Sequence, residues 1–116
     1  MLALLVLSCD AVAANAPRAS VRGEADYLTY CAPCHGRSGN GDGPLAALLA
    51  PRPARHSDAA FMRTLSDDYL LRFLKQGGRA FGKSALMGAW GRTLSDEQLR
   101  GLVSFMRSLA SHADRG

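Results

Sequence analysis

The amino-acid sequence predicts an all-α fold, a small bundle of about four helices. No run of residues alternates between apolar and polar at the period of a strand, whereas several segments combine a helix cap with apolar residues at helical spacing. The length of 116 residues fits one small domain, whose hydrophobic core is marginal unless a bound group adds apolar surface.

The first half of the chain is predicted to contain one helix followed by loops. A helix is expected from about residue 21 to residue 30, with Ser20 as its N-cap. Residues 39–44 contain three glycines and a proline and therefore predict a loop, and Pro51-Arg52-Pro53 predicts a second break. Residues 45–49, between these breaks, are expected to form a short helical turn.

Two helices with clear end signals are predicted in the second half of the chain. Ser66 caps a helix that runs to Gln76, where two glycines end it. Ser95 and Gln98 form a capping box at the start of the last helix. Apolar residues then recur along this helix at helical spacing: Leu99, Leu102, Val103, Met106 and Leu109.

Residues 31–35 read Cys-Ala-Pro-Cys-His, the spacing that attaches a haem covalently. The thiols of Cys31 and Cys34 can add to the two vinyl groups of one porphyrin, and His35 then provides an axial ligand to the iron. A thiol redox pair of this spacing needs a βαβ pattern nearby, and a zinc site needs a second pair of ligands; the sequence contains neither. The motif therefore predicts one covalently bound haem c, around which the helices pack.

Met87 is the candidate for the second axial ligand. It belongs to a glycine-flanked loop that can wrap over one face of a haem, and a thioether opposite a histidine is the ligand pair of electron-transfer haems. Met62 and Met106 are the competing thioethers, although Met106 lies on the apolar stripe of the last helix. His56 and His112 are expected to be surface histidines, and replacement of Met87 by one of them is the remaining alternative.

From about residue 23 to residue 109 the chain resembles the small monohaem class I cytochromes c of bacteria. The resemblance is carried by Cys31-Ala32-Pro33-Cys34-His35-Gly36, Gly43-Pro44-Leu45, Met87 with Trp90, and Leu94-Ser95-Asp96-Glu97-Gln98. It implies a cytochrome c-like bundle wrapped around one haem. The chain departs from the family at Gly88, where a proline commonly follows the ligand methionine, and the glycine leaves this loop less stiff.

The resemblance also implies supporting roles for residues outside the motif. In the family, the carbonyl of the residue that matches Pro44 accepts the second ring N–H of the haem histidine, so Pro44 is expected to orient His35. Trp90 is expected to lie near a haem propionate with its indole N–H as donor. The first and last helices are expected to cross where Gly23 meets the ring of Phe105.

Residues 1–16 are predicted to be an export signal and residues 17–116 the cytochrome c domain. Residues 2–7 are almost wholly aliphatic, a run far shorter than the roughly 20 residues needed to span a membrane. Small residues up to Ala13 fit a cleavage site. Val6-Leu7-Ser8-Cys9 resembles a lipobox, so cleavage at Cys9 with acylation of its thiol is the alternative. The mature protein is expected in the periplasm, at a membrane only if Cys9 anchors it.

These features predict an electron carrier and not an enzyme. The protein is expected to pass single electrons between periplasmic redox partners that dock briefly at the haem edge, with the iron cycling between Fe(III) and Fe(II). The formal charge of +4 favours an acidic protein partner or an anionic membrane face over nucleic acid. Two alternatives stay open: a peroxidase-like haem enzyme or gas-binding sensor with an open iron site, and the cytochrome subunit of a larger dehydrogenase or oxidase.

Overall fold

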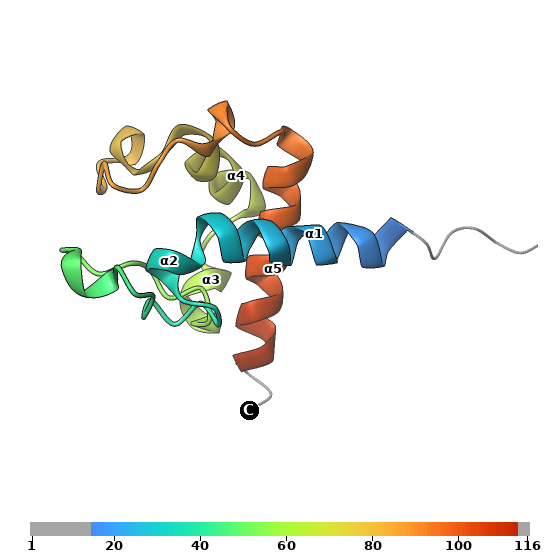
Figure 1. Cartoon of the computed structure of the whole chain (residues 1–116), viewed down its shortest axis with the longest axis horizontal. Helices are drawn as coiled ribbons and strands as arrows, with labels where there is room; N and C mark the ends of the chain where they lie inside the picture. Colours follow the sequence, from blue (N-terminus) through green and yellow to red (C-terminus); the bar gives the residue numbers. More distant parts are fainter. Residues whose placement is uncertain (1–14, 114–116) are drawn as a thin grey trace, which may run out of the picture.

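The computed structural model describes residues 15–113, which fold into helices and turns without a β-strand. Three long helices form the framework: α1 (Asn15–Tyr30), α4 (Asp67–Gln76) and α5 (Asp96–Ala113) (Figure 1). Shorter elements lie in the connections: α2 (Ala32–His35), η2 (Ala46–Leu48), α3 (Ala59–Arg63), η3 (Gly78–Phe81) and η4 (Trp90–Arg92). The predicted all-α class is confirmed, with three main helices where about four were expected, and η2 lies where a short helical turn is predicted.

The first and last helices cross at the point that the sequence predicts. Gly23 of α1 lies at this crossing, because a Cβ there would collide with the carbonyl of Gly101 on α5 and would lie 3.5 Å from the Cβ of Phe105. One turn further along α1, the ring of Tyr27 packs on the ring of Phe105, with 5.1 Å between the centroids. The expected pairing of Gly23 with Phe105 is therefore confirmed.

Helix α1 begins earlier than predicted. It starts at Asn15, so Ser20 lies inside the helix and is not its N-cap. Pro17 does not interrupt the helix because it belongs to the first turn, where the backbone N–H groups have no intrahelical acceptor. The predicted boundary between residues 16 and 17 therefore falls within α1. The rest of the predicted export signal, Cys9 included, lies outside the described residues.

The predicted caps of α4 and α5 are confirmed. The hydroxyl of Ser66 accepts a hydrogen bond from the N–H of Tyr69 at 3.0 Å, and Gly77 ends α4 with a φ of 81°. Ser95 and Gln98 exchange two hydrogen bonds of 3.1 and 3.2 Å, the reciprocal pair of a capping box. These local signals fix where the second half of the chain turns from loop to helix.

Helix α3 is absent from the sequence prediction. Asp58 caps it by accepting a hydrogen bond from the N–H of Phe61 at 3.1 Å. The helix has only five residues, which is too short for an apolar periodicity to be recognised in the sequence. It buries Met62 almost completely, at 1% exposure.

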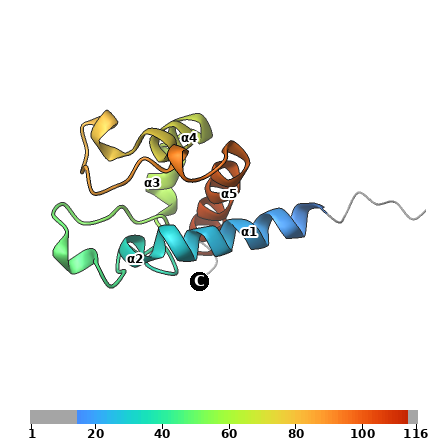
Figure 2. The ribbon, with the colours of Figure 1, turned by 45° about the horizontal axis from the view of Figure 1, so that its top comes forward.

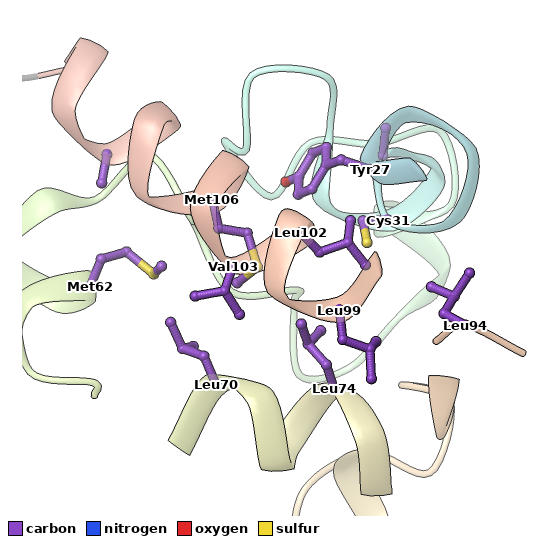
Figure 3. Packing of buried hydrophobic residues seen from close by; sticks show 12 residues of the cluster. Tyr27, Cys31, Met62, Leu70, Leu74, Leu94, Leu99, Leu102, Val103 and Met106 are labelled. Atoms are coloured by element: carbon purple, nitrogen blue, oxygen red, sulfur yellow. The ribbon is translucent and has the colours of Figure 1, made fainter. Parts of the chain in front are cut away.

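The hydrophobic core surrounds α5 (Figure 3). Its buried side chains come from α1, α3, α4 and α5 and from the residues next to them: Tyr27, Cys31, Met62, Leu70, Leu74, Leu94, Leu99, Leu102, Val103 and Met106. Four of the five residues of the predicted stripe on α5 belong to this cluster, and Leu109 is half-buried against it. Because Cys31 is also a member, the Cys-x-x-Cys-His motif begins at the edge of the core.

Two connecting segments, residues 36–58 and residues 77–95, extend to the same side of the crossing helices (Figure 2). They run from teal through green to yellow-green and from yellow to orange in the figures. None of the helices between residues 15 and 113 is both long enough and apolar enough to cross a membrane.

Candidate haem site

A cavity of about 610 Å³ lies between these two segments and the helices. Its volume is within the range of roughly 300–1,000 Å³ that is typical of cofactor and ligand pockets. Five of the six predicted site residues line it: Cys31, Cys34, His35, Met87 and Trp90. The structure therefore brings together residues that are far apart in the sequence, and most of the other lining side chains are apolar or aromatic.

The Cys-x-x-Cys-His motif forms one helical turn that continues directly from α1. The N–H of Cys31 donates to the carbonyl of Tyr27 at 2.9 Å, and the N–H of His35 donates to the carbonyl of Cys31 at 2.8 Å. Since this turn is rigidly joined to α1, both thiols and the imidazole face one cavity. The motif is thus presented by a helix end and not by a flexible loop.

The two thiols are free, and Cys31 is buried as a structural cysteine is. No disulfide joins Cys31 to Cys34. Burial, together with smaller contributions from the nearby Asp26 and Cys34, raises the pKa of Cys31 to about 12. In redox-active pairs of this spacing the pKa of a thiol is lowered, so the environment of Cys31 differs from that of a redox-active cysteine. Within residues 15–113, no three His, Cys, Asp or Glu side chains gather as a metal site.

His35 has a defined tautomer. Its Nδ1 lies 2.9 Å from the carbonyl oxygen of Ala54, and a carbonyl can only accept, so Nδ1 carries the proton. Burial lowers the pKa of His35, although the hydrogen bond to Ala54 opposes this, and the ring is therefore neutral at pH 7. The lone pair consequently lies on Nε2, which is the atom left to bind a metal.

The expected role of Pro44 is wrong, because the carbonyl that orients His35 belongs to Ala54. The segment around Pro44 is attached elsewhere: the N–H of Gly43 donates to the carbonyl of Cys34 at 3.1 Å, and that of Leu45 to the carbonyl of Pro33 at 2.9 Å. These bonds place the segment along the turn of the motif and leave Pro44 exposed. Ala54 follows a proline-bounded stretch of extended chain, but no spacing in the sequence singles out its carbonyl.

His56 is a site residue that the sequence analysis assigns wrongly to the surface. It is buried, at 7% exposure, and lines the cavity. Its ring stacks on that of His35 with 4.2 Å between the centroids and 21° between the planes, and its Nδ1 lies 2.9 Å from the hydroxyl of Tyr27. Burial and the adjacent His35 lower its pKa to about 3, so it is neutral. His112 lies on the exposed surface, as expected.

Met87 is positioned by the two glycines that end α4. The N–H of Gly78 donates to the carbonyl of Met87 at 3.0 Å, and the N–H of Met87 donates to the carbonyl of Ser84 at 3.2 Å. A Cβ at Gly78 would collide with the Ser84 carbonyl and lie 3.1 Å from the Cβ of Met87. Only glycine therefore lets this loop fold back against the end of α4.

The competing methionines also line the cavity, but they differ from Met87 in burial. Met62 and Met106 are 1% and 2% exposed and belong to the core cluster, whereas Met87 is half-buried and packs against the cluster from outside. Of the three thioethers, Met87 is the one carried by a loop and not by a helix.

The indole N–H of Trp90 is a buried donor without a hydrogen-bond partner among the described residues. Its Nε1 has no hydrogen-bond acceptor, although the side chain lines the cavity and its ring packs on Tyr30 with 5.2 Å between the centroids. Leaving such a donor unpaired costs about 1–3 kcal/mol.

A haem fits this cavity. The cavity offers two thiols for attachment, a neutral imidazole with its lone pair on Nε2, a nearby thioether, and an N–H suited to a propionate.

Comparisons with known proteins agree with this chemistry. No curated protein matches the chain. A solved structure described as "KustC0563 c-type cytochrome" is similar, with 25% sequence identity and a TM-score of 0.62 over 75% of this chain and 95% of the other. Residues 18–106 match the family described as "Cytochrome C oxidase, cbb3-type, subunit III". Because that match covers most of the sequence and the fold agrees, the chain belongs to this family and is a c-type cytochrome domain.

Proposed function

We propose that the protein is a monohaem c-type cytochrome that carries single electrons and performs no bond chemistry of its own. The observation that supports this most strongly is that His35 and Met87 line the same cavity as Cys31 and Cys34. Both axial positions of an iron would then have a protein ligand. When bound, the haem supplies an iron that changes between Fe(III) and Fe(II).

The residues around the cavity have separate roles in holding and orienting the haem. Cys31 and Cys34 would hold the haem through thioethers, so that it stays attached in either oxidation state. The Ala54 carbonyl keeps the proton of His35 on Nδ1 and so keeps Nε2 free for the iron. Trp90 would donate its N–H to a propionate, and the mostly apolar cavity wall would exclude water. A fixed and dry site needs little rearrangement when its charge changes, which suits electron transfer.

The loop that carries Met87 favours a carrier over a peroxidase-like enzyme. Peroxide chemistry needs an acid–base side chain on the open face of the iron. The cavity-lining residues of this loop are Gly82, Lys83, Ser84, Leu86, Met87 and Gly88, followed by Trp90. No imidazole, guanidinium or carboxylate is among them, while a thioether is.

The mouth of the cavity is a suitable place for a redox partner to dock. Leu86, which lines the cavity next to Met87, is 75% exposed. The exposed Arg52 and Lys83 also line the cavity. An exposed apolar side chain and two cations at one cavity suit brief contact with an acidic partner. Membership in an oxidase-subunit family favours a second form of this proposal, in which the domain delivers electrons as part of a larger oxidase.

We place the protein in the periplasm, because in bacteria haem is attached to this motif outside the cytoplasmic membrane. The predicted export signal supports this location, with membrane attachment only through Cys9.

Binding of carbon monoxide to the reduced iron distinguishes an electron carrier from an enzyme. The reduced holoprotein should bind it slowly and poorly at neutral pH while exchanging electrons rapidly with small redox partners. Fast, stoichiometric binding together with peroxide turnover would contradict the carrier.

A further inference from the structure

The ring of His56 lies face to face with that of His35 on the cavity wall (4.2 Å between centroids, 21° between planes). The Cys-x-x-Cys-His motif does not specify this contact, and the electron-carrier chemistry assigns no task to a second imidazole beside the first. The contact nevertheless acts on the one side chain whose orientation the site depends on.

A single hydrogen bond does not fix the plane of an imidazole. The bond from His35 Nδ1 to the Ala54 carbonyl sets one direction, but the ring can still turn about that direction. A flat side chain stacked on the face of the ring removes this freedom, because rotation would drive the ring edge into its neighbour. His56 supplies that flat surface.

His56 is itself fixed on two sides. Its Nδ1 lies 2.9 Å from the hydroxyl of Tyr27, a residue with no exposed surface whose ring is packed against Phe105. This hydrogen bond ties the His56 imidazole to the phenol of Tyr27. Tyr27 belongs to α1, and the turn of the motif continues directly from this helix, so α1 supports both His35 and the anchor of His56.

The backbone of His56 is tied to the loop that leaves His35. The N–H of Ser57 donates to the carbonyl of Gly39 at 3.0 Å, and the N–H of Gly41 donates to the carbonyl of His35 at 2.7 Å. A Cβ at Gly39 would lie 3.1 Å from the Cβ of His56, so the two segments are in close contact.

We propose that His56, anchored by the hydroxyl of Tyr27, is a positioning residue that sets the plane of the His35 imidazole. This inference rests on the proposed function, because it concerns the ligand of a bound haem. A phenylalanine at position 56 would also present a flat ring, but it would lack the hydrogen bond that fixes the orientation of that ring. The specific prediction is therefore that Tyr27 and His56 act as one unit.

The test uses ferric holoprotein and a readout that depends on the plane of the axial imidazole. That plane sets the splitting of the iron d orbitals, so the g values in electron paramagnetic resonance respond to its rotation. Tyr27→Phe and His56→Phe should each shift the largest g value and broaden its signal. The double variant should match His56→Phe alone, because both changes break the same contact. The reduction potential should shift in the same variants.

Phe105→Leu is the matched control. It removes the ring that packs against Tyr27 but leaves the Tyr27 hydroxyl and His56 in place, so it should lower the melting temperature without changing the g values. Tyr27→Phe and His56→Phe proteins with wild-type g values and potentials, differing only in melting temperature, would overturn the proposal. Loss of a strong axial ligand in His56→Phe would also overturn it, since His56 would then be a ligand itself.

Failure of the proposed function gives a different result. The g values of the variants report on the His35 side of the iron, so the variants can be compared with the wild type whichever group binds the opposite side. A wild-type protein without covalent haem, or with an open iron site, would contradict the electron carrier and would be seen before any variant is examined.

Discussion

Gly23 of α1 lies directly against the backbone carbonyl of Gly101 on α5, so that the two helices touch without an intervening side chain. We expect Gly23→Ala to destabilise the holoprotein by about 1–3 kcal/mol, because the added methyl forces the helices apart. Denaturant unfolding measures this. Glu24→Ala, at the exposed neighbouring position, should change stability by no more than about 0.5 kcal/mol. Equal effects of the two variants would contradict the close crossing.

Arg107 of α5 joins three segments. Its Nη1 donates to the carbonyl of Met62 at 2.6 Å, its Nη2 to the carbonyl of Leu65, and its Nε to Asp67 at 2.9 Å. Arg107→Ala should cost about 1.5–3 kcal/mol in unfolding free energy, because both carbonyls lose a charged donor. Asp67→Asn should cost at most about 1 kcal/mol, since the Asp67 side chain is 69% exposed. A larger loss in Asp67→Asn would mean that the ion pair, and not the carbonyl bonds, joins these segments.

Trp90 should contribute to the stability of the holoprotein through its N–H. Trp90→Phe removes the buried donor, and if a propionate accepts from it, unfolding free energy falls by about 1.5–3 kcal/mol, as for a charge-assisted hydrogen bond. Guanidinium unfolding of the ferric protein measures the change. Tyr30→Phe keeps the ring that packs on Trp90 and should be within about 0.5 kcal/mol of wild type. An unchanged stability of Trp90→Phe would show that the N–H reaches no acceptor.

The sequence predicts best what is decided locally. The caps at Ser66 and Ser95 depend on side chains within one turn of the helix end, so the residue pattern is sufficient to find them. The close contact at Gly23 was predicted only through the resemblance to a known family, since one glycine in a helix does not by itself identify its neighbour.

The errors concern contacts between loops. The partner of His35 depends on how residues 39–57 fold over the motif, and neither Pro44 nor Ala54 carries a distinguishing side chain. The burial of His56 depends on the same folding and on a hydroxyl from another segment, Tyr27, so a polar residue in a loop was assigned to the surface. The predicted start of α1 is too late because Ser20, a residue type that favours the N-cap, lies inside the helix, which begins at Asn15.

Met87 should be the sixth ligand in the ferric protein. Met87→Ala is expected to lose the weak far-red charge-transfer band of a thioether bound to ferric haem, to lower the reduction potential and to speed the binding of carbon monoxide. Met62→Leu and Met106→Leu are the controls and should keep the band, since both methionines belong to the core. A band that survives in Met87→Ala and disappears in Met62→Leu would assign the ligand to Met62.

The most direct test of the account uses holoprotein made in cells that attach haem. The purified protein is extracted with acid–acetone, and its intact mass is then measured. The expected mass is that of the polypeptide plus one haem, because thioethers at Cys31 and Cys34 do not dissociate. The Cys31→Ala, Cys34→Ala double variant should release all of its haem to the organic phase. A wild-type protein that returns the mass of the bare polypeptide, or a double variant that retains haem at the wild-type level, would contradict covalent attachment at this motif.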